Sequence, residues 1–217
     1  MVLRRLQSLL GRLYDLDVDY DVYDFLLTDR GARDELMPTD GRHAPEEELL
    51  LAESADGARV ALYIDQAVLR RLEKADPLGA LTERNLADYC TALEGVSHFL
   101  YSTWRLECDA PVSLLELETQ AEVDKYAATV FLVADQQGGG YPGQVHARLF
   151  DRVGFDERLS PAQHERYRTA HRCAANFCKR LESKFVSRGR AQLEALVREL
   201  RKFYRLRSAA KLRYAGA

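Results

Sequence analysis

The sequence places carboxylate, imidazole and amine side chains at helical spacing: Glu94, His98, Glu118, Glu122 and Lys125. Residues four apart lie on one face of a helix, so Glu94 can touch His98, and Glu118 can touch Glu122. Carboxylates that a fold buries need a proton, a cation or a pairing partner. Helical bundles bind metal ions with inward-facing Glu and His, usually spaced Glu-x-x-His, whereas the spacing here is Glu-x3-His. We therefore expect either an ion-pair network around Lys125 or a metal site made by these glutamates and His98.

Gly95 and a second polar strip belong to the same two helices. Gly95 costs about 1 kcal/mol in helix propensity, but it leaves no side chain between its helix and a neighbour. The sequence therefore predicts that another helix crosses at this point. Glu116, Gln120 and Asp124 recur on a different side of their helix from Glu118, and we expect them to face solvent.

The segment RYRTAH, from Arg166 to His171, pairs an arginine with a histidine. This Arg-x4-His spacing resembles that of some helical-bundle ribonucleases of the HEPN type. The resemblance covers these two residues, and Tyr167 stands where those ribonucleases often have a polar residue. It implies that the histidine moves protons near neutral pH and that the arginine neutralises charge on the phosphorane. On one regular helix the two side chains lie about 140° apart.

The C-terminal segment from Lys179 to Arg213 is strongly basic. It holds twelve Lys and Arg against three Glu, a net charge of +9 in a chain whose total is −3. The last predicted helix has an apolar face and, opposite it, a basic face made of Arg198, Arg201, Lys202 and Arg205. Such a helix can present its cations to nucleic-acid phosphates, to an acidic protein or to an anionic membrane surface. The alternative is a solvated helix whose charge complements an acidic body.

Two further patterns lack the residues that their chemistry needs. Asp17, Asp19 and Asp21 have the spacing of a calcium loop, but Val22 and Thr28 occupy the positions of its glycine and glutamate. The glycine-rich stretch QQGGGYPGQ carries no Lys-Ser/Thr and follows a predicted helix, so it predicts a helix stop rather than a phosphate loop. No cofactor is expected.

Composition and cysteine content indicate a globular cytosolic protein. Hydrophobic residues make up 47% and charged residues 30% of the 217 residues, and no apolar run is long enough for a transmembrane helix. The first residues lack the continuous apolar core of a secretory signal. The four cysteines form no CxxC pair, so we expect reduced thiols in a cytoplasmic protein.

Periodicity predicts an α+β protein that is mostly α, with residues 1–217 as a single unit. Residues 1–65 should form a helix and a small antiparallel meander of about three strands, with a long polar loop over 30–47. Val18, Tyr20 and Val22 alternate with aspartates and predict one strand, and Asp56-Gly57 predicts a hairpin. Residues 66–217 should form a bundle of long helices, ending in the basic amphipathic one. The predicted helices are 66–74, 82–107, 112–136, 144–152, 161–187 and 190–213.

Three functions remain open on this basis. The first is a non-catalytic cytosolic binding or accessory module, whose basic C-terminal helix engages nucleic acid or an acidic protein partner. The second is an enzyme built on the bundle, either a HEPN-like ribonuclease or a metal-dependent enzyme. The third is a structural subunit, such as a homo-oligomer, whose exposed apolar surface a partner chain covers.

Overall fold

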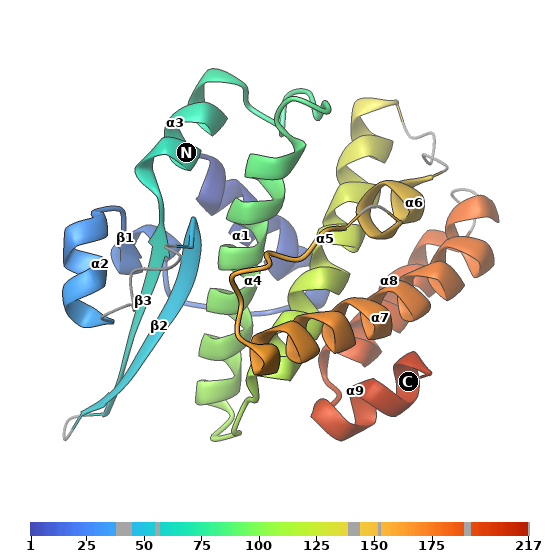
Figure 1. Ribbon diagram of the computed structural model, residues 1–217. Coiled ribbons are helices and arrows are strands. Elements are labelled where there is room, and N and C mark those ends of the chain that lie inside the picture. Colours follow the sequence, from blue (N-terminus) through green and yellow to red (C-terminus); the bar gives the residue numbers. More distant parts are fainter. Residues whose placement is uncertain (38–44, 55–56, 139–143, 152, 189–191, 217) are drawn as a thin grey trace.

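The protein is mostly helical with one small sheet, which confirms the predicted α+β class (Figure 1). The structure is a computed structural model that describes residues 1–37, 45–54, 57–138, 144–151, 153–188 and 192–216. The elements in chain order are α1 (Val2–Tyr14), the 3-10 turn η1 (Val22–Phe25), β1 (Leu26–Leu27), α2 (Arg30–Leu36), β2 (Glu47–Ser54), β3 (Gly57–Ile64), α3 (Gln66–Lys74), α4 (Leu86–Glu107), α5 (Leu114–Gln136), α6 (Val145–Phe150), α7 (Pro161–Lys184), the 3-10 turn η2 (Val186–Arg188), α8 (Leu193–Tyr204) and α9 (Ser208–Ala215).

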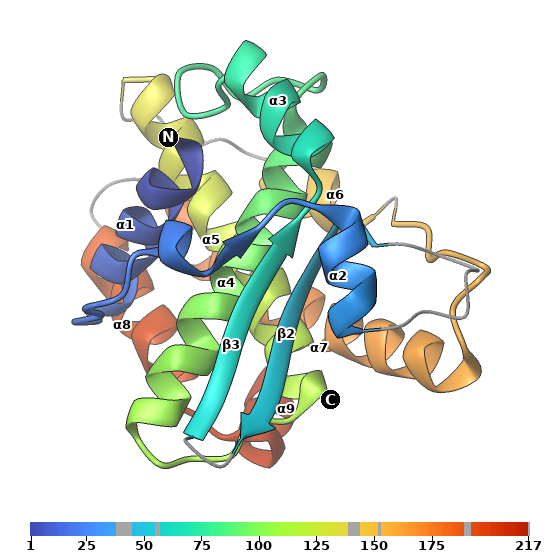
Figure 2. The same cartoon turned by 90° about the vertical axis from the view of Figure 1, so that its left-hand side faces the viewer.

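The sheet has the order β1-β3-β2 and lies as an outer layer over α4 (Figure 2). Strands β2 and β3 form the predicted antiparallel hairpin, with Ser54 opposite Gly57; the connecting residues 55–56 lie outside the described part of the chain. Strand β1 pairs with β3 in parallel, so the sheet is mixed and not wholly antiparallel as predicted. The reason is that β1 reaches the far side of β3 directly from η1, without a hairpin turn.

The strand predicted around Val18–Val22 is wrong. Gln7 on α1 takes up the backbone groups that a strand would use: its side chain donates to the Tyr20 carbonyl at 2.5 Å and accepts from the Val22 amide at 2.9 Å. Asp21 then caps η1 by accepting from the Tyr23 amide. These side-chain hydrogen bonds replace sheet pairing with a turn.

The polar segment 30–47 is not a continuous loop as predicted. Asp29 accepts a hydrogen bond from the Ala32 amide at 2.7 Å and so begins α2, which ends at Leu36. Residues 38–44 lie outside the described part of the chain, and β2 begins at Glu47.

The long helices lie close to their predicted bounds, but the last one is divided. The predicted helix 190–213 consists of α8 and α9, which are separated at Arg205–Arg207. Tertiary contacts set this break: Arg180 on α7 donates to the carbonyls of Tyr214 and Ala215, and the side chain of Lys211 is buried at 1% exposure. Helix α9 therefore turns back toward α7.

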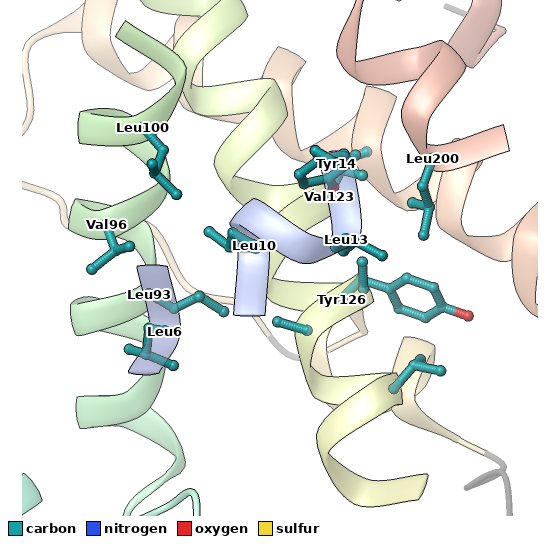
Figure 3. Packing of buried hydrophobic residues seen from close by; sticks show 14 of the residues in the cluster. Leu6, Leu10, Leu13, Tyr14, Leu93, Val96, Leu100, Val123, Tyr126 and Leu200 are labelled. Atoms are coloured by element: carbon teal, nitrogen blue, oxygen red, sulfur yellow. The ribbon is translucent and has the colours of Figure 1, made fainter. Parts of the chain in front are cut away.

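Helix α1 is a central part of the core. Its leucines recur at helical spacing, and Leu3, Leu6 and Leu10 are at most 1% exposed. Figure 3 shows Leu6 and Leu10 on the side of α4, where Leu93 and Val96 lie. Burial of each such leucine contributes about 1.5–3 kcal/mol, so this N-terminal helix packs as part of the helical layer.

Gly95 on α4 faces the sheet, and the predicted helix crossing is wrong. A Cβ atom at this position would lie 3.0 Å from Leu62 Cδ1 on β3 and 3.1 Å from Glu47 Oε2 on β2. Only the absence of a side chain allows the hairpin to approach α4 this closely. The consequence is that the Glu47 carboxylate reaches the polar side of α4.

Candidate functional site

The polar residues predicted on α4 and α5 meet between these two helices. Lys125 Nζ lies 3.0 Å from Glu94 Oε2 and 2.5 Å from Glu122 Oε1, and its side chain is 14% exposed. One turn away, His98 Nε2 lies 3.7 Å from Glu118 Oε2. Antiparallel packing of neighbouring helices brings the two strips face to face, so the residues form one connected cluster.

Glu47 on β2 joins this cluster, and the sequence did not point to it. Its Oε1 lies 3.6 Å from His98 Nδ1, on the opposite side of the imidazole from Glu118. His98 is 6% exposed, and its Nε2 has no hydrogen-bond partner among the described residues. The same is true of Glu47 Oε2. The imidazole is therefore held at Nδ1, while Nε2 is free toward Glu118.

The two carboxylates on α5 have opposite pKa shifts although they are one turn apart. Burial raises the pKa of Glu118 to about 7. Burial also acts on Glu122, but the Lys125 ammonium and the His171 imidazole lower its pKa to about 2. Burial alone would lower the pKa of His98, yet the carboxylates of Glu47 and Glu118 raise it to about 9. Lys125 therefore neutralises Glu122, whereas Glu118 carries the least compensated charge.

Arg166 and His171 on α7 contact different turns of α5. Arg166 Nε lies 3.7 Å from Glu118 Oε1, whereas His171 Nδ1 lies 3.4 Å from Glu122 Oε2. His171 Nε2 also lies 3.2 Å from the Phe150 carbonyl. The structure therefore engages the two side chains separately, and the paired ribonuclease mechanism stays a prediction.

A cavity of about 1210 Å³ opens beside this cluster. Glu47, His98, Glu118 and Arg166 lie along its polar side. Its other described lining residues come from α2 and the segment after it, from β2, from the start of α5 and from the start of α7: Arg33, Met37, Pro45, Glu48, Leu49, Leu51, Leu114, Leu117, Glu157, Arg158, Leu159, Ser160, Pro161, Gln163 and Tyr167. Because residues with buried, unpaired polar atoms line an open space here, this cavity is the candidate functional site.

A second polar cluster lies under α9, and it corrects the solvent-facing strip predicted on α5. Glu116, Gln120 and Asp124 are 3%, 0% and 1% exposed. Asp124 accepts hydrogen bonds from the hydroxyl of Tyr14 and from Ser97 Oγ. Helices α1 and α9 cover this side of α5, so these polar groups are structural partners of one another.

The basic residues of α8 are partly used inside the protein. Arg201 Nε donates to the Leu13 carbonyl at 2.8 Å, and Arg205 donates to the Tyr14 carbonyl at 3.1 Å. These carbonyls form the C-terminal end of α1, where a helix dipole favours positive charge. Lys202 lies over the ring of Tyr214, and Arg198 is 70% exposed beside Glu194. Polyanion binding by this face stays a prediction, with Arg198 as a largely exposed cation.

Replacing Arg201 with alanine should lower the free energy of unfolding by about 1 kcal/mol, because two hydrogen bonds to the end of α1 are lost. Replacing Arg198, also on α8, should change it by less than about 0.5 kcal/mol. Urea unfolding monitored by circular dichroism measures both values. Equal stability of the two variants would show that the α1 contact contributes nothing.

Comparisons of the chain with models of protein families, with curated proteins and with solved structures find no match. Within the described ranges, no helix is both long and apolar enough to cross a membrane. The functional proposal therefore depends on the geometry of the cavity and its polar cluster.

Proposed function

We propose that the protein is a metal-dependent enzyme, whose divalent ion binds to Glu94, His98 and Glu118; the last two of these residues line the cavity. The observation that carries this proposal is a set of three ligand atoms, one from each residue, that lie within 4.8 Å of one another. Two ligand atoms of a tetrahedral ion at 2.0–2.2 Å are about 3.3–3.6 Å apart. The widest pair would therefore have to close by up to about 1.5 Å to complete the set.

The surroundings of these ligands support the proposal. A metal-binding histidine usually offers one ring nitrogen to the ion and donates the other N–H to a carboxylate. His98 has this arrangement, with Nδ1 facing Glu47 and Nε2 unpartnered. Lys125 holds one oxygen of Glu94 and leaves the other oxygen for an ion.

The local charge also favours a cation. When His98 has given up its proton to bind an ion and the glutamates are ionised, Glu47, Glu94, Glu118 and Glu122 outnumber the positive charges of Lys125 and Arg166 by two. A divalent ion would neutralise this excess. The competing explanation is a protonated His98 between Glu47 and Glu118, which would make the cluster an ion-pair network without a metal.

A metal ion at this position suits a catalytic role better than a structural one. Structural ions are usually enclosed by four protein ligands, whereas catalytic ions keep a position open for water or substrate. The proposed set supplies three ligands and borders the cavity. An ion there would polarise a bound group or lower the pKa of a bound water.

Metal titration tests the proposal directly. Protein stripped with a chelator should bind about one Zn²⁺ or Mn²⁺ per chain in calorimetry, and elemental analysis after dialysis should give the same ratio. His98→Gln should weaken the affinity more than about 100-fold, and Glu47→Gln, which disturbs only the support of His98, about tenfold.

His146→Gln is the matched control, because this histidine also lies on a helix but has its Nε2 against the Ala175 carbonyl, and the variant should bind the ion like the wild type. Thermal melts establish that each variant is folded. A metal content near zero without calorimetric binding would reject the proposal in favour of the ion-pair network. Binding that His98→Gln leaves unchanged would also reject this site.

A further inference from the structure

We infer that the cavity binds an amphiphilic small molecule, with an anionic head group at Arg166 and an apolar part along Leu51 and Leu114. The inference rests on the proposed function in that it names the substrate class of the same site. It depends on residues of the cavity wall other than the proposed metal ligands, so the two can be tested separately.

Arg166 is the cation that the cavity offers to a ligand. Among the described lining residues, Arg33 is held by Glu48 and Asp34, and Arg158 is held by Asp156 at 2.6 Å. Arg166, in contrast, lies 3.7 Å from Glu118, its side chain is 23% exposed, and its buried Nε has no hydrogen-bond partner among the described residues. A guanidinium in this position can take a carboxylate or a phosphate through paired N–H donors.

The surroundings of Arg166 hold its guanidinium in place and add positive potential to this part of the cavity. Its Cζ atom lies 5.1 Å from the centre of the Tyr167 ring, which also lines the cavity. The first residues of α7, from Ser160 to Gln163, border the same space, so the positive end of a 24-residue helix dipole points toward it.

The opposite part of the cavity is apolar and exposed. Leu51 on β2 is 45% exposed, Leu114 at the start of α5 is 58% exposed, and Met37 after α2 is 47% exposed. Large apolar side chains that gather at one cavity while open to water are typical of a ligand-binding surface.

The polar and apolar parts are close enough for one small molecule. Leu114 lies one turn before Glu118 on the same face of α5, a distance of about 6 Å along the helix. Leu117 lies between them and also lines the cavity. A head group at Arg166 therefore places the next carbon atoms of the molecule against the leucines, and a volume of about 1210 Å³ holds an alkyl chain of moderate length.

Three probes with the same chain and different heads test this inference: octyl phosphate, octanoate and octanol, each titrated below 1 mM by calorimetry. We expect at least one anion to bind about tenfold or more tightly than octanol. Arg166→Gln should remove this preference, and Arg166→Lys should restore part of it. Leu114→Ser should weaken all three probes. The comparison of octyl phosphate with octanoate identifies the head group.

Arg168→Gln is the matched control, since Arg168 is an exposed arginine on the same helix, and it should leave all affinities unchanged. Titrations of chelator-stripped and Zn²⁺-loaded protein separate the two proposals. Anion binding that needs Arg166 in a protein without metal affinity would reject the metal and keep this inference. Octanol binding as tight as that of the anions, an anion preference that survives Arg166→Gln, or no binding of any probe would overturn it.

Discussion

Replacing Lys125 with methionine should lower the free energy of unfolding by about 3–5 kcal/mol. The ammonium of Lys125 bonds to Glu94 and Glu122, whose side chains are 24% and 20% exposed. Without it, two largely buried carboxylates lose their closest cation, and a buried charge without a partner costs far more than a lost hydrogen bond. Urea unfolding at pH 7, with the slope of the transition checked for two-state behaviour, gives the difference.

The triple variant Lys125→Met, Glu94→Gln, Glu122→Gln separates the charge effect from a packing effect. Removal of all three charges also removes the cost of burying them, so the triple variant should regain more than half of the lost stability. A loss of less than about 1 kcal/mol in Lys125→Met alone would contradict the interpretation. It would mean that water or protons already compensate these carboxylates.

Helical spacing was sufficient to find most of the cluster, because residues three or four apart share a helix face whatever surrounds them. It placed Glu94 beside His98, and Glu118 and Glu122 beside Lys125. Spacing could not show that the two strips face each other, because this depends on the rotation of α4 and α5 about their axes. Spacing also cannot show which element packs against a given helix face. The sequence therefore predicts a helix beside Gly95, whereas β2 and β3 fill this space.

The sequence does not predict that Glu47 belongs to the cluster, for a different reason. It lies far from His98 along the chain, and its place beside the imidazole follows from its pairing with Ile64 and from the gap at Gly95. An alternation of apolar residues cannot give the register of a strand against a helix. Likewise, no strand forms at Val18–Val22, because the Gln7 side chain bonds to backbone groups of this segment. This contact between α1 and the segment exists only in the folded chain.

In the C-terminal helices, the sequence predicts neither the break between α8 and α9 nor the burial of a lysine. Neither proline nor glycine marks the break between α8 and α9, so the periodic pattern predicts one helix. Lys211 is one of the twelve basic residues between Lys179 and Arg213, yet it is 1% exposed. The strip of Glu116, Gln120 and Asp124 is covered by Lys211, and a periodic pattern that predicts one straight helix cannot bring Lys211 to this place.

Lys211 should make the protein more stable as the pH rises from 7 to 10. Burial lowers the pKa of its ammonium to about 7, and repulsion from Arg105 acts in the same direction. The carboxylates of Glu116 and Asp124 raise this pKa and so oppose the effect of burial. The faces of Tyr101, Phe203 and Tyr204 favour the charged form and limit this shift. Between the folded pKa and the unfolded value of about 10.4, the unfolded chain binds more protons than the folded one. Stability therefore rises with pH in this window and is flat with respect to Lys211 below it.

Comparison with Lys211→Met isolates this contribution, because methionine fills similar space without a charge. Other groups titrate in the same window: the raised pKa of His98, about 9, makes stability fall as the pH passes through that value. This effect is common to both proteins and cancels in their difference. We expect the free energy of unfolding of the wild type, relative to Lys211→Met, to rise by more than about 1 kcal/mol between pH 7 and pH 10.

Lys202→Met is the matched control, since this lysine lies on the outside of α8 over the ring of Tyr214, where its charge remains in water. Its stability curve should run parallel to that of the wild type from pH 7 to pH 10. Parallel curves for wild type and Lys211→Met would show that Lys211 stays charged in the folded protein. In that case the three aromatic faces and the carboxylates of Glu116 and Asp124 outweigh the burial of the ammonium, and α9 is held by a full charge pair.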